Sequence, residues 1–150
     1  MGKVVEAPVY YEGRESTLFL AGGITGCLDW QAQAAQMLED TPWVVFNPRR
    51  KDFPINDPGA AYEQIRWEYD HLLRATAILF WFSPGQIQPI ALFELGRWSF
   101  TSKPLFVGRD PDYPRRRDVD CQLVFARPGM NPQECLVATV RMAHEWLLMS

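Results

Sequence analysis

The chain has 150 residues, 47% of them hydrophobic, and a formal net charge of −3 at pH 7. This length is typical of one domain, and the apolar content is enough for a hydrophobic core. The weak negative charge excludes long-range attraction to nucleic-acid polymers or anionic membranes, and no apolar segment is long enough to cross a bilayer.

Three cysteines without a C-x-x-C spacing indicate reduced thiols in a cytoplasmic protein. The N-terminus lacks the basic and then apolar pattern of a secretion signal. Residues 1–16 are polar and irregular, so we expect a flexible N-terminal arm followed by one domain at residues 17–150.

The first predicted strand is Thr17–Ala21, a short apolar run that precedes the glycine-rich segment Gly22–Gly26. Glycines at this point let a ligand approach the backbone closely. Thr25 or Asp29 can cap a helix that continues to about residue 40. Its expected buried stripe consists of Trp30, Ala34, Met37 and Leu38.

The second strand is predicted at Trp43–Phe46, and two prolines after it indicate a long loop from Asn47 to about Gly59. Long loops in compact domains are often functional. A strongly amphipathic helix is then expected over Ala60–Ala75, with Asp70 close to its end. The apolar residues that recur at helical spacing in it are Tyr62, Ile65, Tyr69, Leu72 and Leu73.

The apolar run Ala77–Phe82 predicts a third buried strand, which Ser83–Gly85 ends. Pro89 suits the first turn of the next helix, where a missing N–H group costs nothing. Glu94 falls in the opening turns of that helix, which is expected to run to about residue 101. The later elements are strands at Pro104–Gly108 and Gln122–Phe125, a charged loop at residues 109–120 between them, and a helix over Pro132–Leu148.

Strands alternate with helices in this order, which indicates an α/β fold with a doubly wound, parallel five-stranded sheet and helices on both faces. Ligands of such sheets bind beyond the carboxyl ends of the strands. The loops Gly22–Gly26, Asn47–Asp57 and Ser83–Gln88 all leave the predicted sheet at that edge. We therefore expect them to form one pocket, toward which Glu94 opens.

Two acids are candidates for chemistry in this pocket. The positive helix end favours the ionised form of Glu94, and an ionised carboxylate can act as a nucleophile. Asp70 would supply a second carboxyl group. Such a pair suits cleavage of a glycosidic C–N bond, because one carboxylate stabilises or attacks the sugar carbon while the other manages a proton. Taken singly, either acid also fits a solvated helix surface.

Other functions have less support in the sequence. The glycine pattern is G-G-x-x-G instead of G-x-G-x-x-G, and the second strand ends in Asn47 instead of an acid. Arg49 and Arg50 nevertheless leave an NADP-phosphate contact open. Ser83 lacks the G-x-S-x-G context of a hydrolase nucleophile, the lysine motif of a P-loop is absent, and the two histidines form no zinc motif.

Five segments carry a family resemblance over about residues 17–108: L-F-L-A-G-G-I, V-V-F-N-P-R-R, Q-I-R-W-E-Y-D, I-L-F-W-F and P-I-A-L-F-E-L-G. In this order they resemble the nucleoside 2-deoxyribosyltransferase-like proteins. The resemblance implies a flavodoxin-like sheet, a homo-oligomer, a small-molecule nucleoside or nucleotide as substrate, and neither a metal nor an organic cofactor.

The resemblance also implies roles for individual residues. Glu94, which precedes L-G, matches the nucleophilic glutamate, and Asp70 matches the sugar-orienting aspartate, with Glu68 as the other match. The residues expected to bind substrate are Gly22, Gly23, Asn47, Arg49, Trp67, Ser83 and Gln88. The glycines would offer backbone groups, Trp67 a ring for base stacking, and Arg49 together with Arg50 a contact to a 5′-phosphate.

Two positions depart from the family pattern, because base-exchanging members have acids where this chain has Gln88 and Thr76. We expect cleavage of an N-glycosidic bond through a covalent sugar–glutamate ester. A second base resolves the ester in a 2-deoxyribosyltransferase, and water resolves it in an N-glycoside hydrolase. The alternative is a non-catalytic nucleotide-binding or regulatory module on the same fold.

Overall fold

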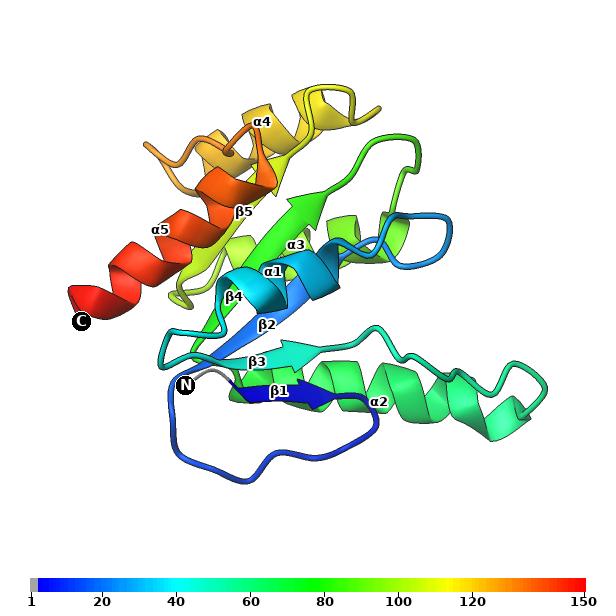
Figure 1. Cartoon of the computed structure of the whole chain (residues 1–150). Coiled ribbons are helices and arrows are strands. Elements are labelled where there is room, and N and C mark those ends of the chain that lie inside the picture. Colours follow the sequence, from blue (N-terminus) through cyan, green and yellow to red (C-terminus); the bar gives the residue numbers. More distant parts are fainter. Residues whose placement is uncertain (1–2) are drawn as a thin grey trace.

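The centre of the fold is a five-stranded sheet whose strands all run parallel, in the order β1-β3-β2-β4-β5 (Figure 1). The computed structural model describes residues 3–150. The strands are β1 (Lys3–Glu6), β2 (Thr17–Gly22), β3 (Val44–Asn47), β4 (Ala77–Phe82) and β5 (Leu105–Arg109). The helices are α1 (Trp30–Met37), α2 (Pro58–Arg74), α3 (Pro89–Ser99), α4 (Arg116–Ala126) and α5 (Leu136–Leu148). The expected α/β, flavodoxin-like class is confirmed, and β2 to β5 agree with the predicted strands to within one residue.

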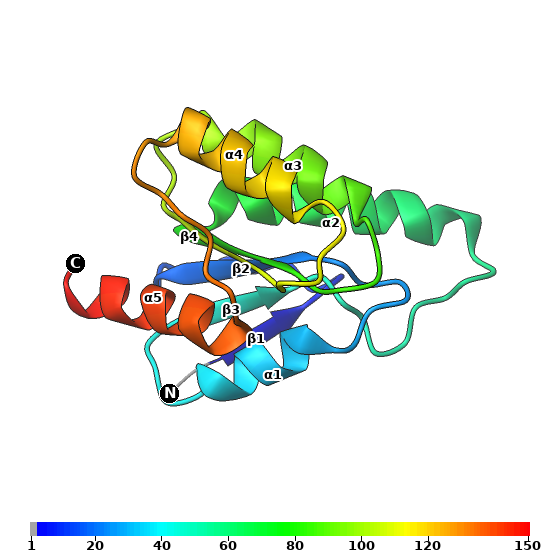
Figure 2. The same cartoon turned by 90° about the horizontal axis from the view of Figure 1, so that it is seen from above.

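Helices cover both faces of the sheet, with α1 and α5 on one face and α2, α3 and α4 on the other (Figure 2). Successive strand residues point to opposite faces. Leu18 and Leu20 of β2 therefore pack with α1 and α5, whereas Phe19 and Ala21 pack on the side of α2 and α3. None of the helices within residues 3–150 has the length and apolarity needed to cross a membrane.

The flexible arm expected at residues 1–16 is wrong for the part that forms β1. Lys3–Glu6 pairs in parallel with β3 at the edge of the sheet, and Val5 is buried while Val4 is exposed. The segment that follows is tied to α2, because Trp67 donates its Nε1–H to the Val9 carbonyl. A four-residue edge strand with one buried side chain carries too little apolar pattern to be recognised. Residues 1–2 lie outside the described residues.

The strand expected at Gln122–Phe125 is also wrong, because these residues belong to helix α4. Val119 and Leu123, four residues apart, are buried, whereas Phe125 is exposed. This is the spacing of one helix face. A short apolar run fits a strand and a buried helix equally well. Here the residues before Gln122 belong to the same helix, which begins at Arg116. The last helix, α5, begins at Leu136 instead of the predicted Pro132.

Helix α2 lies where it was predicted, but a different face of it is buried. Ala60, Trp67, His71 and Leu72 face the core. Of the predicted apolar stripe only Leu72 is buried, and Tyr62, Ile65, Tyr69 and Leu73 remain exposed. His71 fits the core because its two ring nitrogens bond to the Trp67 carbonyl and the Tyr11 N–H. The rotation of α2 decides which of its acids reach the candidate site.

Candidate active site

A cavity of about 670 Å³ lies at the carboxyl edge of the sheet, between the glycine loop after β2 and the facing sides of α2 and α3. This volume is in the range of ligand sites for small molecules. The residues that line it include Gly22, Gly23, Ile24, Thr25, Pro48, Ile65, Glu68, Tyr69, Leu72, Gln88, Phe93, Glu94 and Arg97. The wall is largely apolar, and two carboxyl groups face into it.

Glu94 and Glu68 are these two acids, one from α3 and one from α2. Burial, together with the charge of Glu68, raises the pKa of Glu94 from 4.5 to about 8. Burial also raises the pKa of Glu68, against a hydrogen bond of 2.8 Å from Gln64 Nε2. Two carboxyl groups in a poorly hydrated space resist ionising together. The pair therefore retains a proton at neutral pH.

Hydrogen bonds leave the carboxyl group of Glu94 open to a ligand but fix that of Glu68. Gln64, one turn before Glu68, donates to its Oε2 and also to the Pro48 carbonyl at 2.6 Å. Within residues 3–150 no group donates a hydrogen bond to the Glu94 carboxyl group. Its pKa is raised by burial and by the charge of Glu68, and it is lowered by the charge of Arg97. Glu68 is thus held in place, whereas Glu94 has free oxygen atoms.

Asp70 does not reach this cavity, which corrects the expected acid pair. Its carboxylate accepts a 2.8 Å hydrogen bond from the Tyr10 hydroxyl and pairs with Arg66 at 3.2 Å. The Tyr10 hydrogen bond is the main cause that lowers the pKa of Asp70. One helical residue is a rotation of about 100°, so Asp70 points roughly 200° away from Glu68. Glu68, the other acid in the same segment, takes the position beside Glu94.

The two glycines of the loop are needed for packing. A Cβ on Gly22 would lie 2.3 Å from the Trp81 carbonyl oxygen, and one on Gly23 would lie 2.4 Å from Cys27 Sγ. The Gly23 N–H donates to Gln88 Oε1 at 3.0 Å. The Gly23 carbonyl accepts from Trp30 Nε1 and Gln31 Nε2, both at 3.1 Å. Both polar backbone groups of Gly23 are therefore used inside the protein and do not face a ligand.

Gln88 connects the glycine loop to the turn before α3. Its Nε2 donates to the Ser83 carbonyl at 2.7 Å and to the Gln86 carbonyl at 3.1 Å, while its Oε1 accepts from Gly23. Its backbone is left-handed, with φ of 59°, which is strained for a residue with a side chain. Gln88 lines the cavity as expected, but its amide is fully engaged. Ser83 is buried behind it and does not line the cavity.

Three other expected binding residues also lie outside the cavity lining. The guanidinium of Arg49 donates to the carbonyls of Leu28 and Cys27 at 2.9 and 2.8 Å, so it braces the glycine loop. Asn47 is buried and accepts from the Arg49 N–H. Trp67 is completely buried in the core and cannot stack on a base. Arg49 is consequently not free for an NADP phosphate.

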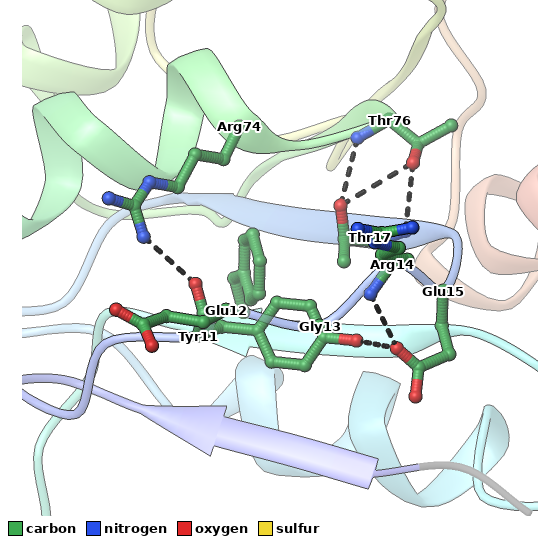
Figure 3. Close-up of a pocket in the computed structure, with 9 residues that line it drawn as sticks. Tyr11, Glu12, Gly13, Arg14, Glu15, Thr17, Arg74 and Thr76 are labelled. Carbon is green, nitrogen blue, oxygen red and sulfur yellow. Dashed lines mark hydrogen bonds between the residues drawn. The ribbon is translucent and has the colours of Figure 1, made fainter.

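A second cavity, of about 520 Å³, lies at the opposite, amino edge of the sheet (Figure 3). Thr17 and Thr76 form part of its wall, and each hydroxyl accepts from the backbone N–H of the other at 2.9 Å. Neither Glu94 nor Glu68 contributes to it. Within residues 3–150 there is also no cluster of His, Cys, Asp and Glu that could hold a metal ion. The cavity between α2 and α3 is therefore the candidate active site.

Residues 15–113 match the model of a protein family described as nucleoside 2-deoxyribosyltransferase like. The match spans β2 to β5 together with α2 and α3, and it contains both Glu68 and Glu94. The chain has no significant match among curated proteins.

The structure predicts that Gln88→Ala loosens the glycine loop, because the Gly23 N–H loses its acceptor and the Ser83 and Gln86 carbonyls lose their donor. We expect a loss of about 1–3 kcal/mol in the free energy of unfolding, together with faster hydrogen exchange at the Gly23 amide. Gln33→Ala, on the exposed side of α1, is the matched control. Unchanged protection of the Gly23 amide in Gln88→Ala would contradict this role.

Proposed function

Because the chain belongs to the nucleoside 2-deoxyribosyltransferase-like family, we propose that it is an enzyme that breaks the N-glycosidic bond of nucleosides or nucleoside monophosphates. The observation that supports this most directly is that Glu94 and Glu68 face one cavity of about 670 Å³. The sugar passes either to water, as in a hydrolase, or to a second base, as in a transferase.

Glu94 is the proposed nucleophile, because its oxygen atoms are free and it projects from α3 into the cavity. Its ionised carboxylate attacks C1′ of the sugar, the C1′–N bond breaks, and its electron pair leaves with the base. Water or an acceptor base then attacks C1′, the C1′–O bond to Glu94 breaks to restore its carboxylate, and Glu68 takes up the proton that the attacking group releases. Two displacements at the same carbon retain its configuration.

Glu68 replaces Asp70 as the second acid in this mechanism. The shared proton of the pair resides on Glu68 when Glu94 is ionised, so Glu68 can protonate the departing base or bond to a sugar hydroxyl. Gln88 cannot take this part, because both ends of its amide bond to the protein. The proton that the departing base takes up must therefore come from the Glu68–Glu94 pair.

We predict that Glu94→Gln lowers the release of free base by at least about 1,000-fold, because the amide is a poor nucleophile. The assay incubates nucleosides and nucleoside monophosphates with and without an acceptor base and follows free base by chromatography. Product without an acceptor identifies a hydrolase, and product only with an acceptor identifies a transferase.

Asp70→Asn is the control for this experiment and separates the two possible acid pairs. It should stay within about threefold of the wild type, whereas Glu68→Gln should lose most of its activity. Wild-type turnover that survives Glu94→Gln would contradict the mechanism. Saturable nucleotide binding without any turnover would support a non-catalytic nucleotide-binding module in its place.

We further infer that the chain forms a homo-oligomer through the exposed apolar side of α2 and α3. Tyr62 and Phe93 are 72% and 71% exposed, and both lie on this side. The other apolar residues of the surface are Ile65, Tyr69, Leu73 and Ile90. Exposed apolar side chains gathered on neighbouring helices are typical of protein interfaces, and here four of them, Ile65, Tyr69, Ile90 and Phe93, also line the cavity. A second copy placed here would exclude water from the two acids.

We predict that Tyr62→Asp converts the oligomer to monomers, because a charge in an apolar interface costs several kcal/mol. Sedimentation velocity at micromolar concentration measures the change. Ile55→Asp, at a residue that is 85% exposed and lies outside this surface, should leave the oligomer intact. A monomeric wild type, or dissociation by Ile55→Asp as well, would contradict the assignment of the surface.

A further inference from the structure

Arg97 is the one cationic side chain among the described residues that line the cavity. It lies one helical turn after Glu94 on α3, and residues at this spacing share one side of a helix. Its guanidinium carbon is 4.8 Å from the centre of the Tyr69 ring and 5.0 Å from that of Trp98. Two aromatic rings, one from each helix, therefore hold the charge at the rim of the cavity.

Several other arginines bond to carbonyls or carboxylates of the protein, and Arg97 does not do so within the described residues. Arg49, Arg74 and Arg127 donate to backbone carbonyls, and Arg109 pairs with Asp120. Within residues 3–150 no carboxylate lies within ion-pair distance of Arg97, although Glu94 precedes it by one turn. Aromatic faces attract the charge without accepting a conventional N–H···O bond. The guanidinium thus keeps its donors for a ligand.

A ligand with an anionic group suits this position. Glu68 and Glu94 give the cavity a negative character, so an anionic substrate needs a cation at the point where its charge resides. A guanidinium forms paired hydrogen bonds with phosphate oxygens through its planar fork. In a nucleotide, the ribose ring and the C5′ methylene separate C1′ from the phosphate. A sugar with C1′ at Glu94 could therefore direct its 5′-phosphate along α3 toward Arg97.

We propose that Arg97 binds the 5′-phosphate of the substrate, so that the preferred substrates are nucleoside 5′-monophosphates instead of nucleosides. This assignment rests on the proposed function of the same cavity. It replaces Arg49 and Arg50 as the expected phosphate contacts. Arg49 is bonded to the carbonyls of Leu28 and Cys27, and Arg50 pairs with Glu63 at 3.2 Å.

The test compares kcat/KM for one nucleoside 5′-monophosphate and for the nucleoside with the same base and sugar, on wild type and Arg97→Gln. The wild type should prefer the monophosphate by roughly 10- to 100-fold, and Arg97→Gln should bring the ratio close to 1. Arg97→Lys should restore part of the preference. Because both substrates are assayed on one preparation at one pH, any unfolded fraction and any change in Glu94 ionisation cancel in the ratio.

Arg66→Gln is the matched control, because Arg66 also lies over the Tyr69 ring, at 5.6 Å, but does not line the cavity. Its substrate ratio should equal that of the wild type. If the wild type cleaves both substrates equally, or if Arg97→Gln keeps the preference, the assignment of Arg97 is overturned while the glycosidic function stands.

If the wild type cleaves neither substrate, the proposed function fails, and calorimetric binding tests Arg97 separately. A nucleoside monophosphate should then bind roughly 10-fold or more weakly to Arg97→Gln than to the wild type. Equal affinities would overturn the assignment. Inorganic phosphate that binds the wild type as tightly as the nucleotide would also overturn it, because the cavity would then not recognise a nucleotide.

Discussion

Two glutamates that face one cavity oppose each other's ionisation at neutral pH, and this constraint determines the chemistry that the site can perform. Burial raises the pKa of both, and the charge of Glu68 raises that of Glu94 further. The apolar side chains of α2 and α3 that line the cavity offer no hydrogen-bond donors that would relieve the repulsion. The protein thus keeps one proton and one negative charge side by side. A reaction that needs a nucleophile and a proton donor at the same place can use both.

The scaffold maintains this arrangement through hydrogen bonds that fix the glycine loop, Glu68 and the turn before α3. Gln88, Arg49 and the side chains of α1 occupy the donors and acceptors of the glycine loop. Gln64 holds Glu68, and the Tyr113 hydroxyl donates to the Ile87 carbonyl at 2.5 Å to fix the turn before α3. The groups of the cavity lining that stay available to a ligand include Glu94, the second oxygen of Glu68 and the guanidinium of Arg97, together with the side chains of Thr25, Tyr69 and Gln86.

The sequence predicted the sheet, the edge at which the cavity lies and the place of Glu94 in its lining, because these follow from strand order and from the position of a helix start. It did not predict the rotation of α2. That helix carries two apolar stripes, and the one that contains Trp67 and His71 looks more polar than the one that contains Tyr62 and Ile65. The fold nevertheless buries His71, since the Trp67 carbonyl and the Tyr11 N–H satisfy its ring. The choice between Asp70 and Glu68 depends on that rotation, and only tertiary contacts fix it. Arg97 was missed because an exposed helix arginine has no local signal.

The central claim is that Glu94 and Glu68 share one proton at neutral pH because both carboxyl groups face the same cavity. Carbon-13 NMR on protein with labelled glutamate carboxyl groups measures this directly, and the Glu94 signal is assigned by its absence in Glu94→Gln. The account predicts a midpoint at a pKa of about 8, which falls when Glu68→Gln removes the neighbouring charge. A midpoint near the ordinary pKa of 4.5, unchanged in Glu68→Gln, would contradict it.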